Sequence, residues 1–154
     1  MADPSSSVIA RNPSAGRDFL FLETFEAGIQ LNGAEVKSLR ARRANMREAF
    51  ARVDQGEVWL YGLDITPWPQ SSMRQEPKRP RRLLLHKEQI EKLQSKVGNG
   101  TGLTITAVKL YFKKSLVKVE IALAKGKKQF DRREDIKKRE SDREIARALK
   151  RRIK

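Results

Sequence analysis

The chain has 154 residues, about the length of one ordinary domain, and 38% of them are hydrophobic, enough for one modest core. Its 34 Lys and Arg against 19 Asp and Glu give a formal net charge of +15, which makes a polyanion the leading partner. The absence of cysteine excludes disulfides and thiolate metal sites. We find no secretory signal and no apolar run near the roughly 18 residues of a membrane span, so we expect a soluble, cytoplasmic protein with no membrane partner.

The N-terminal part predicts a flexible segment followed by a strand and a short helix. Residues 1–16 mix Ser, Pro, Gly and Ala with few apolar anchors, and we expect them to be flexible. Residues 18–23 carry apolar groups on both faces of a predicted strand. Thr24 then predicts the N-cap of a short helix that has Glu26 in its first turn and ends at Gly33.

The next segment predicts paired strands. Residues 34–42 alternate imperfectly between polar and apolar side chains, which is a weak strand pattern. Gln55-Gly56 predicts a hairpin turn between Val53 and Val58. Residues 57–65 place four large side chains on one face of a strand at period two: Trp59, Tyr61, Leu63 and Ile65.

An extended basic loop and a helix follow. Residues 66–82 hold four of the six prolines and five Lys or Arg, which predicts the loop. Residues 83–85 return to the core, and residues 87–98 predict a helix that ends at a glycine and has an apolar face made of Ile90, Leu93 and Val97.

The remaining pattern predicts an antiparallel hairpin made of residues 103–112 and 116–124. About six short strands, with one helix between the fourth and the fifth and no regular strand-helix alternation, favour a sheet that closes on itself. We therefore predict a mainly β fold, a small OB-like antiparallel β-barrel with accessory helices, over residues 17–130.

A basic C-terminal tail, residues 131–154, completes the chain. It holds eleven Lys and Arg against six Asp and Glu. The D-x-x-E pattern from Asp131 to Glu134 is a capping box that would begin a helix. The apolar stripe of that helix, Ile145, Leu149 and Ile153, is too narrow to hold it on the barrel. Our hypothesis is that the tail is disordered alone and becomes helical when it binds.

Four segments resemble one known family. In chain order they are FEAGIQLNGAEVKSLR, GEVWLYGLDITPW, RRLLLHKEQIEKL and VKVEIALAKGKKQFDRRED, and together they look like the SsrA-binding protein family, small protein B. The likeness covers roughly residues 11–140. It implies an OB-like barrel that binds the tRNA-like domain of transfer-messenger RNA (SsrA RNA) without a cofactor. The family brings that RNA to ribosomes stalled on mRNA without a usable stop codon, which is trans-translation.

The resemblance also implies the partners and the RNA-binding residues. The partners are transfer-messenger RNA charged with alanine, the decoding centre and mRNA channel of the small ribosomal subunit, and, indirectly, elongation factor Tu. The implied RNA-binding residues are Asn12, Glu26, Leu84, His86, Lys125, Lys127 and Lys128. Four of these have simpler interpretations. Glu26 suits a helix start and Leu84 suits the core. His86 suits a helix N-cap, and Asn12, before a proline, suits a turn.

The resemblance implies that a second group of residues engages the ribosome: Gly126, Asp131, Arg132, Arg133, Lys137, Lys138 and Arg139. Arg132 replaces the family's usual lysine, which keeps the charge and adds a planar fork that suits phosphates. Gly126 permits either a positive φ or a close approach of RNA, although a surface turn with solvated lysines is the simpler interpretation. In this family-based hypothesis the tail becomes helical in the empty mRNA channel, where rRNA phosphates neutralise its charge.

Two other functions compete with this one. A metal-dependent nuclease needs converging carboxylates, and the candidates are Asp64, Glu120, Asp131, Glu134 and Asp135. One histidine, no cysteine, no phosphate-binding glycine loop and no nucleophile elbow argue against an enzyme, and we expect neither a metal nor a catalytic residue. The stronger competitor is a general RNA-binding or ribosome-associated OB-fold protein, which would lack a preference for transfer-messenger RNA at moderate salt.

Overall fold

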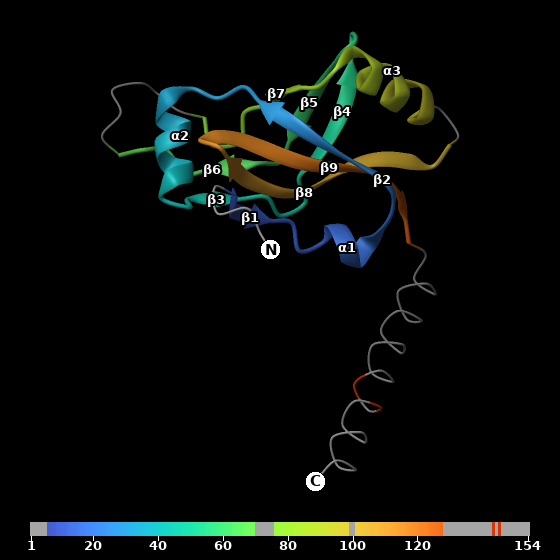
Figure 1. Ribbon diagram of the computed structural model, residues 1–154, viewed down its shortest axis with the longest axis horizontal. Helices are drawn as coiled ribbons and strands as arrows, with labels where there is room; N and C mark the ends of the chain where they lie inside the picture. The colour runs from blue at the N-terminus through green and yellow to red at the C-terminus, as the bar shows by residue number, and fades with distance from the viewer. Residues whose placement is uncertain (1–5, 70–75, 99–100, 128–142, 144, 146–154) are drawn as a thin grey trace.

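The computed structural model describes residues 6–69, 76–98, 101–127, 143 and 145 (Figure 1). Its main sheet consists of seven antiparallel strands: β1 (Ser6–Arg11), β2 (Phe19–Ile29), β4 (Phe50–Asp54), β5 (Glu57–Tyr61), β7 (Arg81–Leu84), β8 (Leu103–Lys113) and β9 (Leu116–Gly126). Two short strands, β3 (Ala44–Asn45) and β6 (Asp64–Ile65), form a separate pair. The helices are α1 (Ala15–Asp18), α2 (Gly33–Arg40) and α3 (Lys87–Lys96).

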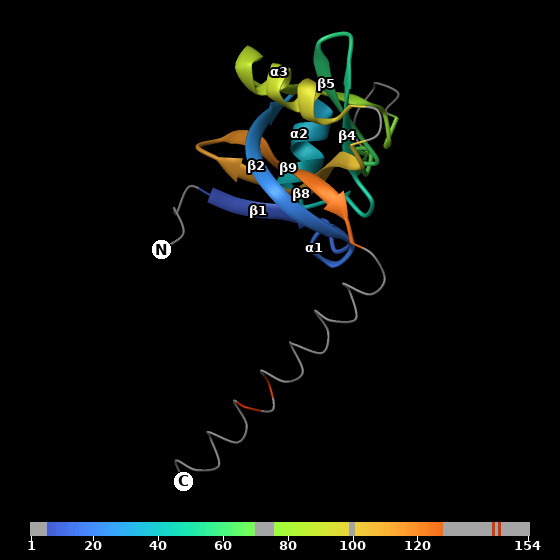
Figure 2. The same cartoon turned by 90° about the vertical axis from the view of Figure 1, so that its right-hand side faces the viewer.

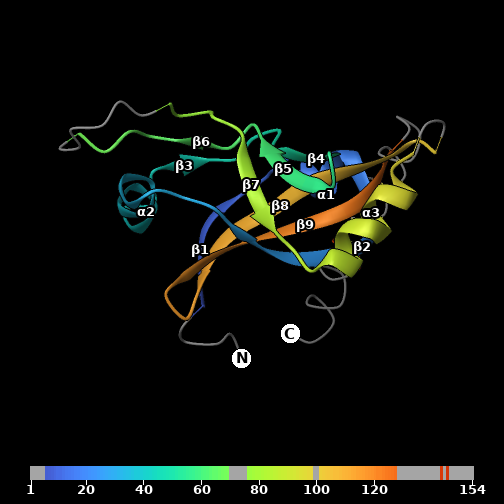
Figure 3. The same cartoon turned by 90° about the horizontal axis from the view of Figure 1, so that it is seen from above.

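The main sheet closes into a barrel. Its strand order is β1-β8-β4-β5-β7-β2-β9, and β8 also pairs with β9, so six strands form a ring. The second edge of β8 is shared: β4 pairs with its first half and β1 with its second half. The views from the side and from above show the long β8–β9 hairpin, and β2 runs antiparallel beside β9 (Figures 2 and 3). The predicted mainly β, OB-like antiparallel barrel is confirmed.

The interior of the barrel is apolar. Each strand of the ring turns alternate residues inward, where they meet Leu39 from α2 and Leu93 and Ile90 from α3. The largest apolar side chains that are completely buried are Leu39, Met46, Leu60, Leu63, Ile65, Leu83, Leu93, Ile105, Leu110, Ile121 and Leu123. Leu93 lies in the middle of α3, so the predicted helix and its apolar face are confirmed.

Both predicted hairpins are present, and their turns have the backbone that tight hairpins need. Gln55 and Gly56 have φ of 51° and 77°, and Lys114 and Ser115 have φ of 49° and 71°. Two consecutive residues with positive φ match the right-handed twist of the strands they join. The hairpins fix the register of β4 with β5 and of β8 with β9.

The predictions for residues 24–42 are wrong. β2 continues without a break through Thr24 and Glu26 to Ile29, because β9 pairs with it along almost its whole length. The helix begins instead at Gly33. Asn32 is its N-cap: the Asn32 Oδ1 accepts the Glu35 N–H at 2.9 Å, and Glu35 Oε1 accepts the Asn32 N–H at 3.1 Å. This N-x-x-E capping box outweighs the weak alternation that suggested a strand.

The prediction that four large side chains of residues 57–65 share one face is also wrong. Val58 and Leu60 are buried, whereas Trp59 and Tyr61 are half-buried on the outer face of β5. Gly62 follows with φ of 81° and changes the phase, so that Leu63 and Ile65 point into the core. A Cβ at Gly62 would lie 3.2 Å from the backbone of residues 48 and 49, so the position needs glycine.

The N-terminal segment joins the sheet. β1 pairs with β8 from Ser6 to Arg11, and the Asn12 N–H donates to the Val108 carbonyl at 2.9 Å. The predicted flexible segment 1–16 and its boundary with the barrel at residue 17 are therefore wrong for the described residues 6–16. The second half of β8 has a free edge, and this segment pairs with it. The composition of the segment does not indicate this pairing. No helix within the described ranges is long and apolar enough to span a membrane.

Candidate nucleic-acid interface

Three of the predicted RNA-binding residues lie together on the outer face where β2 meets β7. Gly28 faces Leu84 across this antiparallel pair. Glu26 and His86 each lie two residues away from that facing pair, in opposite chain directions, and therefore on the same side of it. All three side chains are exposed, Leu84 by 51%. The interpretations of Glu26 as a helix start and of Leu84 as a core residue are therefore wrong.

His86 is the N-cap residue of α3, as its simpler interpretation predicted. Its backbone N–H donates to Gln89 Oε1 at 3.1 Å. The imidazole ring remains exposed beside Leu84. His86 can begin α3 and still meet a ligand, because its bond to Gln89 uses the backbone N–H and not the ring.

The Glu26 carboxylate is held by two residues of β8. The Tyr111 hydroxyl donates to Oε2, and Lys113 Nζ lies 3.2 Å from Oε1. The hydrogen bond from Tyr111 is the largest influence on the pKa of Glu26, and together with Lys113 it lowers that pKa against the opposing effect of desolvation. Burial and the same bond raise the pKa of Tyr111. Glu26 is therefore an ionised, oriented acceptor at an otherwise basic surface.

The sequence did not identify Tyr111 and Lys113 as parts of this site. Their spacing of two on a predicted strand places them on one face of β8. Only the order β8-β9-β2 shows that this face meets Glu26, because β9 separates the two strands in the sheet. No local pattern around Glu26 indicates that arrangement.

Asn12 is placed at the other end of β2, and its side chain is used inside the protein. It is 7% exposed. Its Nδ2 donates to the carbonyls of Ala49 at 3.2 Å and Ala107 at 2.8 Å. Its Oδ1 accepts from the N–H and the hydroxyl of Ser14 at 3.1 and 2.8 Å. The bonds to Ser14 confirm that Asn12 is a turn residue. Its bonds to the carbonyls of residues 49 and 107 also hold the segment that leads into α1 against β8.

The end of β9 lies against α1, as Figures 1 and 2 both show. Lys125 is exposed, and Gly126 faces Phe19. The Lys127 N–H donates to the Asp18 carbonyl at 2.8 Å, and its Nζ donates to the Gly16 carbonyl at 3.1 Å. Gly126 has no positive φ, and a Cβ there would meet nothing within 4 Å, so the fold itself does not require glycine at this position.

The remaining predicted residues lie outside the part of the chain that the structure describes: Lys128, Asp131, Arg132, Arg133, Lys137, Lys138 and Arg139. Within the predicted tail, only Arg143 and Ile145 are described, and both are helical and exposed. The roles of the tail residues stay predictions.

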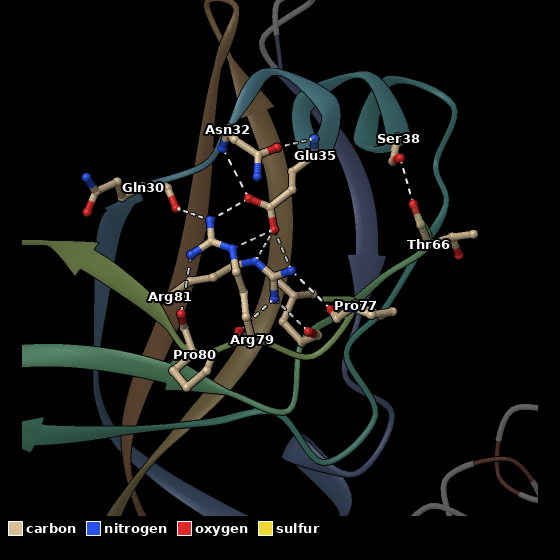
Figure 4. A network of polar contacts seen from close by, with 10 residues as sticks. Gln30, Asn32, Glu35, Ser38, Thr66, Pro77, Arg79, Pro80 and Arg81 are labelled. Atoms are coloured by element: carbon tan, nitrogen blue, oxygen red, sulfur yellow. Dashed lines mark hydrogen bonds and ion pairs between the residues drawn. The ribbon is translucent and has the colours of Figure 1, made fainter. Parts of the chain in front are cut away.

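The predicted basic loop turns two of its arginines inward (Figure 4). Arg81 is completely buried; its Nε donates to Glu35 Oε2 at 2.7 Å, and its Nη1 donates to the Leu63 carbonyl at 2.8 Å. Arg79 donates to Glu35 from the other side. Burial by itself would raise the pKa of Glu35, but the bonds from Arg79, the Asn32 N–H and Arg81 outweigh it and lower that pKa. These arginines serve the fold, which no local pattern in the sequence indicates.

No group of three or more His, Cys, Asp or Glu among the described residues could hold a metal ion. Of the nuclease candidates, Glu120 lies on β9 with the Lys109 Nζ at 3.7 Å, and Asp64 lies on β6. Three other candidates, residues 131, 134 and 135, are outside the described residues. The arrangement that the described part does show is a β-barrel with cationic and apolar side chains on its outside. The fold and this surface define a small basic protein of the OB type, a class that binds nucleic acids and sugars on its outer face.

Comparison with known proteins narrows this class to one family. The model of the family described as "SmpB protein" matches residues 9–151. The SsrA-binding protein of Desulforudis audaxviator is 47% identical over 97% of this chain and 98% of its own length. That of Carboxydothermus hydrogenoformans is 49% identical over 93% of this chain and 96% of its own. The chain belongs to the SmpB family of SsrA-binding proteins, and the resemblance seen in the sequence is confirmed.

A solved structure agrees with this assignment. One chain of the structure described as "tmRNA-SmpB: a journey to the center of the bacterial ribosome" has a TM-score of 0.63 and 44% identity to this chain. The match covers 77% of this chain and 84% of the other.

Proposed function

We propose that this protein binds the tRNA-like domain of transfer-messenger RNA and delivers it to stalled ribosomes for trans-translation. The observation that carries the proposal is the membership in the SsrA-binding protein family over nearly the whole chain. The similarity to a chain of a structure described as tmRNA-SmpB at the ribosome supports the same partners. The protein then acts in the cytoplasm, as a binding protein with no catalytic step of its own.

The outer face of β2 and β7 is the proposed contact with the RNA. Leu84 and His86 offer an exposed apolar side chain and a ring on which an unstacked base can rest. The oriented, ionised Glu26 can accept hydrogen bonds from base amino groups or ribose hydroxyls. A carboxylate repels phosphate, so Glu26 contributes discrimination between RNA features, whereas surrounding cations contribute affinity.

At the end of β9, the lysines proposed to bind RNA lead into the segment proposed to engage the ribosome. Lys125 and Lys127 bring cations to the edge of α1, and we propose that Lys128 continues this group towards the tail. In this proposal Asn12 acts indirectly, by holding α1 against β8. The tail residues from Asp131 to Arg139 contact the decoding centre and the mRNA channel, and elongation factor Tu joins through the RNA.

A competition experiment tests the RNA partner. Labelled tRNA-like domain bound to the protein is challenged at moderate salt with unlabelled tRNA-like domain, bulk tRNA and single-stranded RNA. We expect only the first to compete efficiently, because contacts fitted to a folded RNA survive salt better than phosphate contacts alone. Glu26→Gln should weaken binding about tenfold, and Asp54→Asn, an equal change of charge at the end of β4, should not. Equal competition by all three RNAs would instead indicate a general RNA-binding protein.

A second experiment separates the barrel from the tail. Replacing Asp131, Arg132 and Arg133 by alanine should leave binding of the tRNA-like domain within about twofold and abolish tagging on stalled ribosomes in a reconstituted translation system. Loss of RNA affinity in this variant would show that the division of roles is wrong.

A further inference from the structure

A hollow of about 320 Å³ lies between the end of α1, the start of β4 and the first residues of β8. The largest side chains in its wall are apolar: Phe19, Phe50 and Ile105. The Phe50 ring is held in place by a stack on Tyr61, which faces it across β4 and β5 with the ring centroids 5.5 Å apart. An apolar cavity of about 150 Å³ already accepts benzene, so the hollow has room for one aromatic side chain.

Two carboxylates lie at the hollow, those of Asp18 and Glu48. Asp18 Oδ1 lies 3.3 Å from the Nε of the exposed Arg17. Glu48 is exposed, and no described residue hydrogen-bonds to its side chain or pairs with it. Its φ is 64°, a left-handed conformation that a glutamate rarely adopts. A carboxylate kept at a strained position beside an apolar hollow points to a ligand that brings a positive charge.

The tail leaves the described barrel at this hollow. Gly126 faces Phe19, which belongs to the wall of the hollow. The next residue, Lys127, donates its N–H to the Asp18 carbonyl at 2.8 Å. Phe130 follows three residues later and is the first apolar residue after β9. Three residues span at most about 10 Å, so the Phe130 side chain stays within reach of the hollow.

We propose that the hollow binds the start of the chain's own tail in the free protein, with the Phe130 ring between Phe19 and Phe50. We call this contact the latch. The charges agree with it, because Lys128 and Arg132 flank Phe130 and the hollow offers two carboxylates. A link of three residues gives Phe130 an effective concentration on the order of millimolar at the hollow. A contact that would be weak between separate molecules is therefore formed most of the time.

The latch keeps the start of the tail from weak, nonspecific partners. It holds residues 131–133 at the barrel, and a latch that is closed about nine-tenths of the time lowers their apparent affinity for any polyanion about tenfold. A tight, specific partner outweighs such a loss, whereas a weak one does not. That this partner is the ribosome rests on the proposed function, but the docking itself does not. The expected disorder of the free tail then applies to the residues after 133.

NMR spectra of the full-length protein test the docking. Phe130→Ala should shift the signals of Thr104, Ile105 and Thr106, because an aromatic ring shifts the resonances of the groups that it covers. Ile153→Ala, which removes an apolar side chain near the end of the same tail, should leave those signals unchanged. Dilution of the wild-type protein should leave them unchanged as well. A shift on dilution would mean that a second copy occupies the hollow, which would overturn the proposal.

Digestion with trypsin measures how often the latch opens, since trypsin cuts after Lys and Arg and proteolysis follows the population of the open form. The sites after Arg132 and Arg133 adjoin Phe130, whereas those after Arg151 and Arg152 lie at the end of the tail. Phe130→Ala should raise the initial rate of cleavage at the first pair of sites about tenfold and change that at the second pair by less than about twofold. Mass spectrometry of the released fragments gives both rates from one sample.

Matched variants separate the apolar and the charged parts of the latch. Phe130→Leu, which keeps apolar bulk without a ring, should raise the cleavage after Arg132 less than Phe130→Ala does. Glu48→Gln should raise it about two- to fivefold, and this effect should vanish at about 1 M salt, where charges are screened within about 3 Å. Glu57→Gln, the same substitution on β5 away from the hollow, should leave the cleavage unchanged.

Two further results would overturn the proposal. One is a set of hollow signals that do not respond to Phe130→Ala, and the other is equal cleavage after Arg132 in that variant and in the wild-type protein. Phe130 belongs to the tail, so its replacement leaves the core of the barrel intact. Neither measurement uses RNA or ribosomes. The latch can therefore fail while the proposed delivery function holds, and the delivery function can fail while the latch holds.

Discussion

Glu35 and Glu26 are both carboxylates held by two donor side chains, but they lie in opposite environments. Glu35 is 4% exposed at its side chain and is bonded by Arg79 and the buried Arg81. Glu26 is 40% exposed at its side chain and is bonded by Tyr111 and Lys113 on the barrel surface. Both pKa values are lowered, yet only the Glu26 carboxylate can also meet a ligand.

The comparison shows that burial, not the number of partners, decides what a carboxylate does. A buried ion pair saturates its own groups and leaves nothing for another molecule, and removing one partner strands a charge in the interior. An exposed carboxylate with two donors keeps lone pairs directed to solvent. The same comparison separates Arg81, which ties the basic loop to α2, from Arg82, its neighbour, which remains on the surface.

Glu35→Ala should have the largest effect on stability. It leaves Arg81 buried without its counter-ion and removes the capping box of α2, so we expect a loss of about 3–5 kcal/mol in the free energy of unfolding. Urea denaturation followed by circular dichroism measures it. Replacing Glu35 and Arg81 together by apolar residues should recover part of the loss. A loss below about 1 kcal/mol in Glu35→Ala would contradict the buried pair.

Asn12→Ala should have the next largest effect. It leaves the buried carbonyls of Ala49 and Ala107 with fewer donors, and a loss of about 1–3 kcal/mol in unfolding free energy follows. If Asn12 instead acted by direct contact with RNA, the variant would keep its stability and lose affinity. Denaturation and RNA binding measured on the same sample separate these outcomes.

Tyr111→Phe should disturb Glu26 with a smaller cost, about 0.5–1.5 kcal/mol at neutral pH, near the lower end because the carboxylate is partly solvated. The pKa of Glu26 is lowered in the folded state, so its ionised form contributes stability above its ordinary value of 4.5. That contribution disappears as the pH falls below this value. An NMR titration should find the pKa of Glu26 raised in the variant. An unchanged pKa would show that the Tyr111 hydroxyl does not hold the carboxylate.

Glu57→Ala should have the smallest effect. Glu57 lies 3.2 Å from Arg82, but both side chains are more than a third exposed, and such pairs contribute less than about 0.5 kcal/mol. The unfolding free energy should change by less than about 0.5 kcal/mol, and added salt should change it by no more than that. A loss comparable to that of Glu35→Ala would mean that burial is not the deciding variable.

The sequence predicted the barrel class, both hairpins and α3 well, because each has a local cause. Gln55-Gly56 suits a turn with two positive φ angles, and α3 combines an apolar stripe with a glycine after its end. It failed at β1, β2 and α2. β2 has one long partner, β9, that is about a hundred residues away in the chain, and no local pattern encodes that pairing.

The candidate site divides in the same way. The resemblance selected Glu26, Leu84 and His86, and the structure places them on one face, but their simpler interpretations could not be decided before β2 and β7 were paired. Tyr111, Lys113 and the two inward arginines were not identified, because each depends on a contact with a residue at least 44 positions away.

By itself, the sequence determined the family, the basic character and the turns, since these depend on residue types and on neighbours in the chain. The tertiary structure alone decided which carboxylate and which arginines are buried, which groups Asn12 bonds to, and which rings share the outer face of β4 and β5. Burial and facing are properties of the closed barrel: strands distant in the chain become neighbours only when the ring of six is complete.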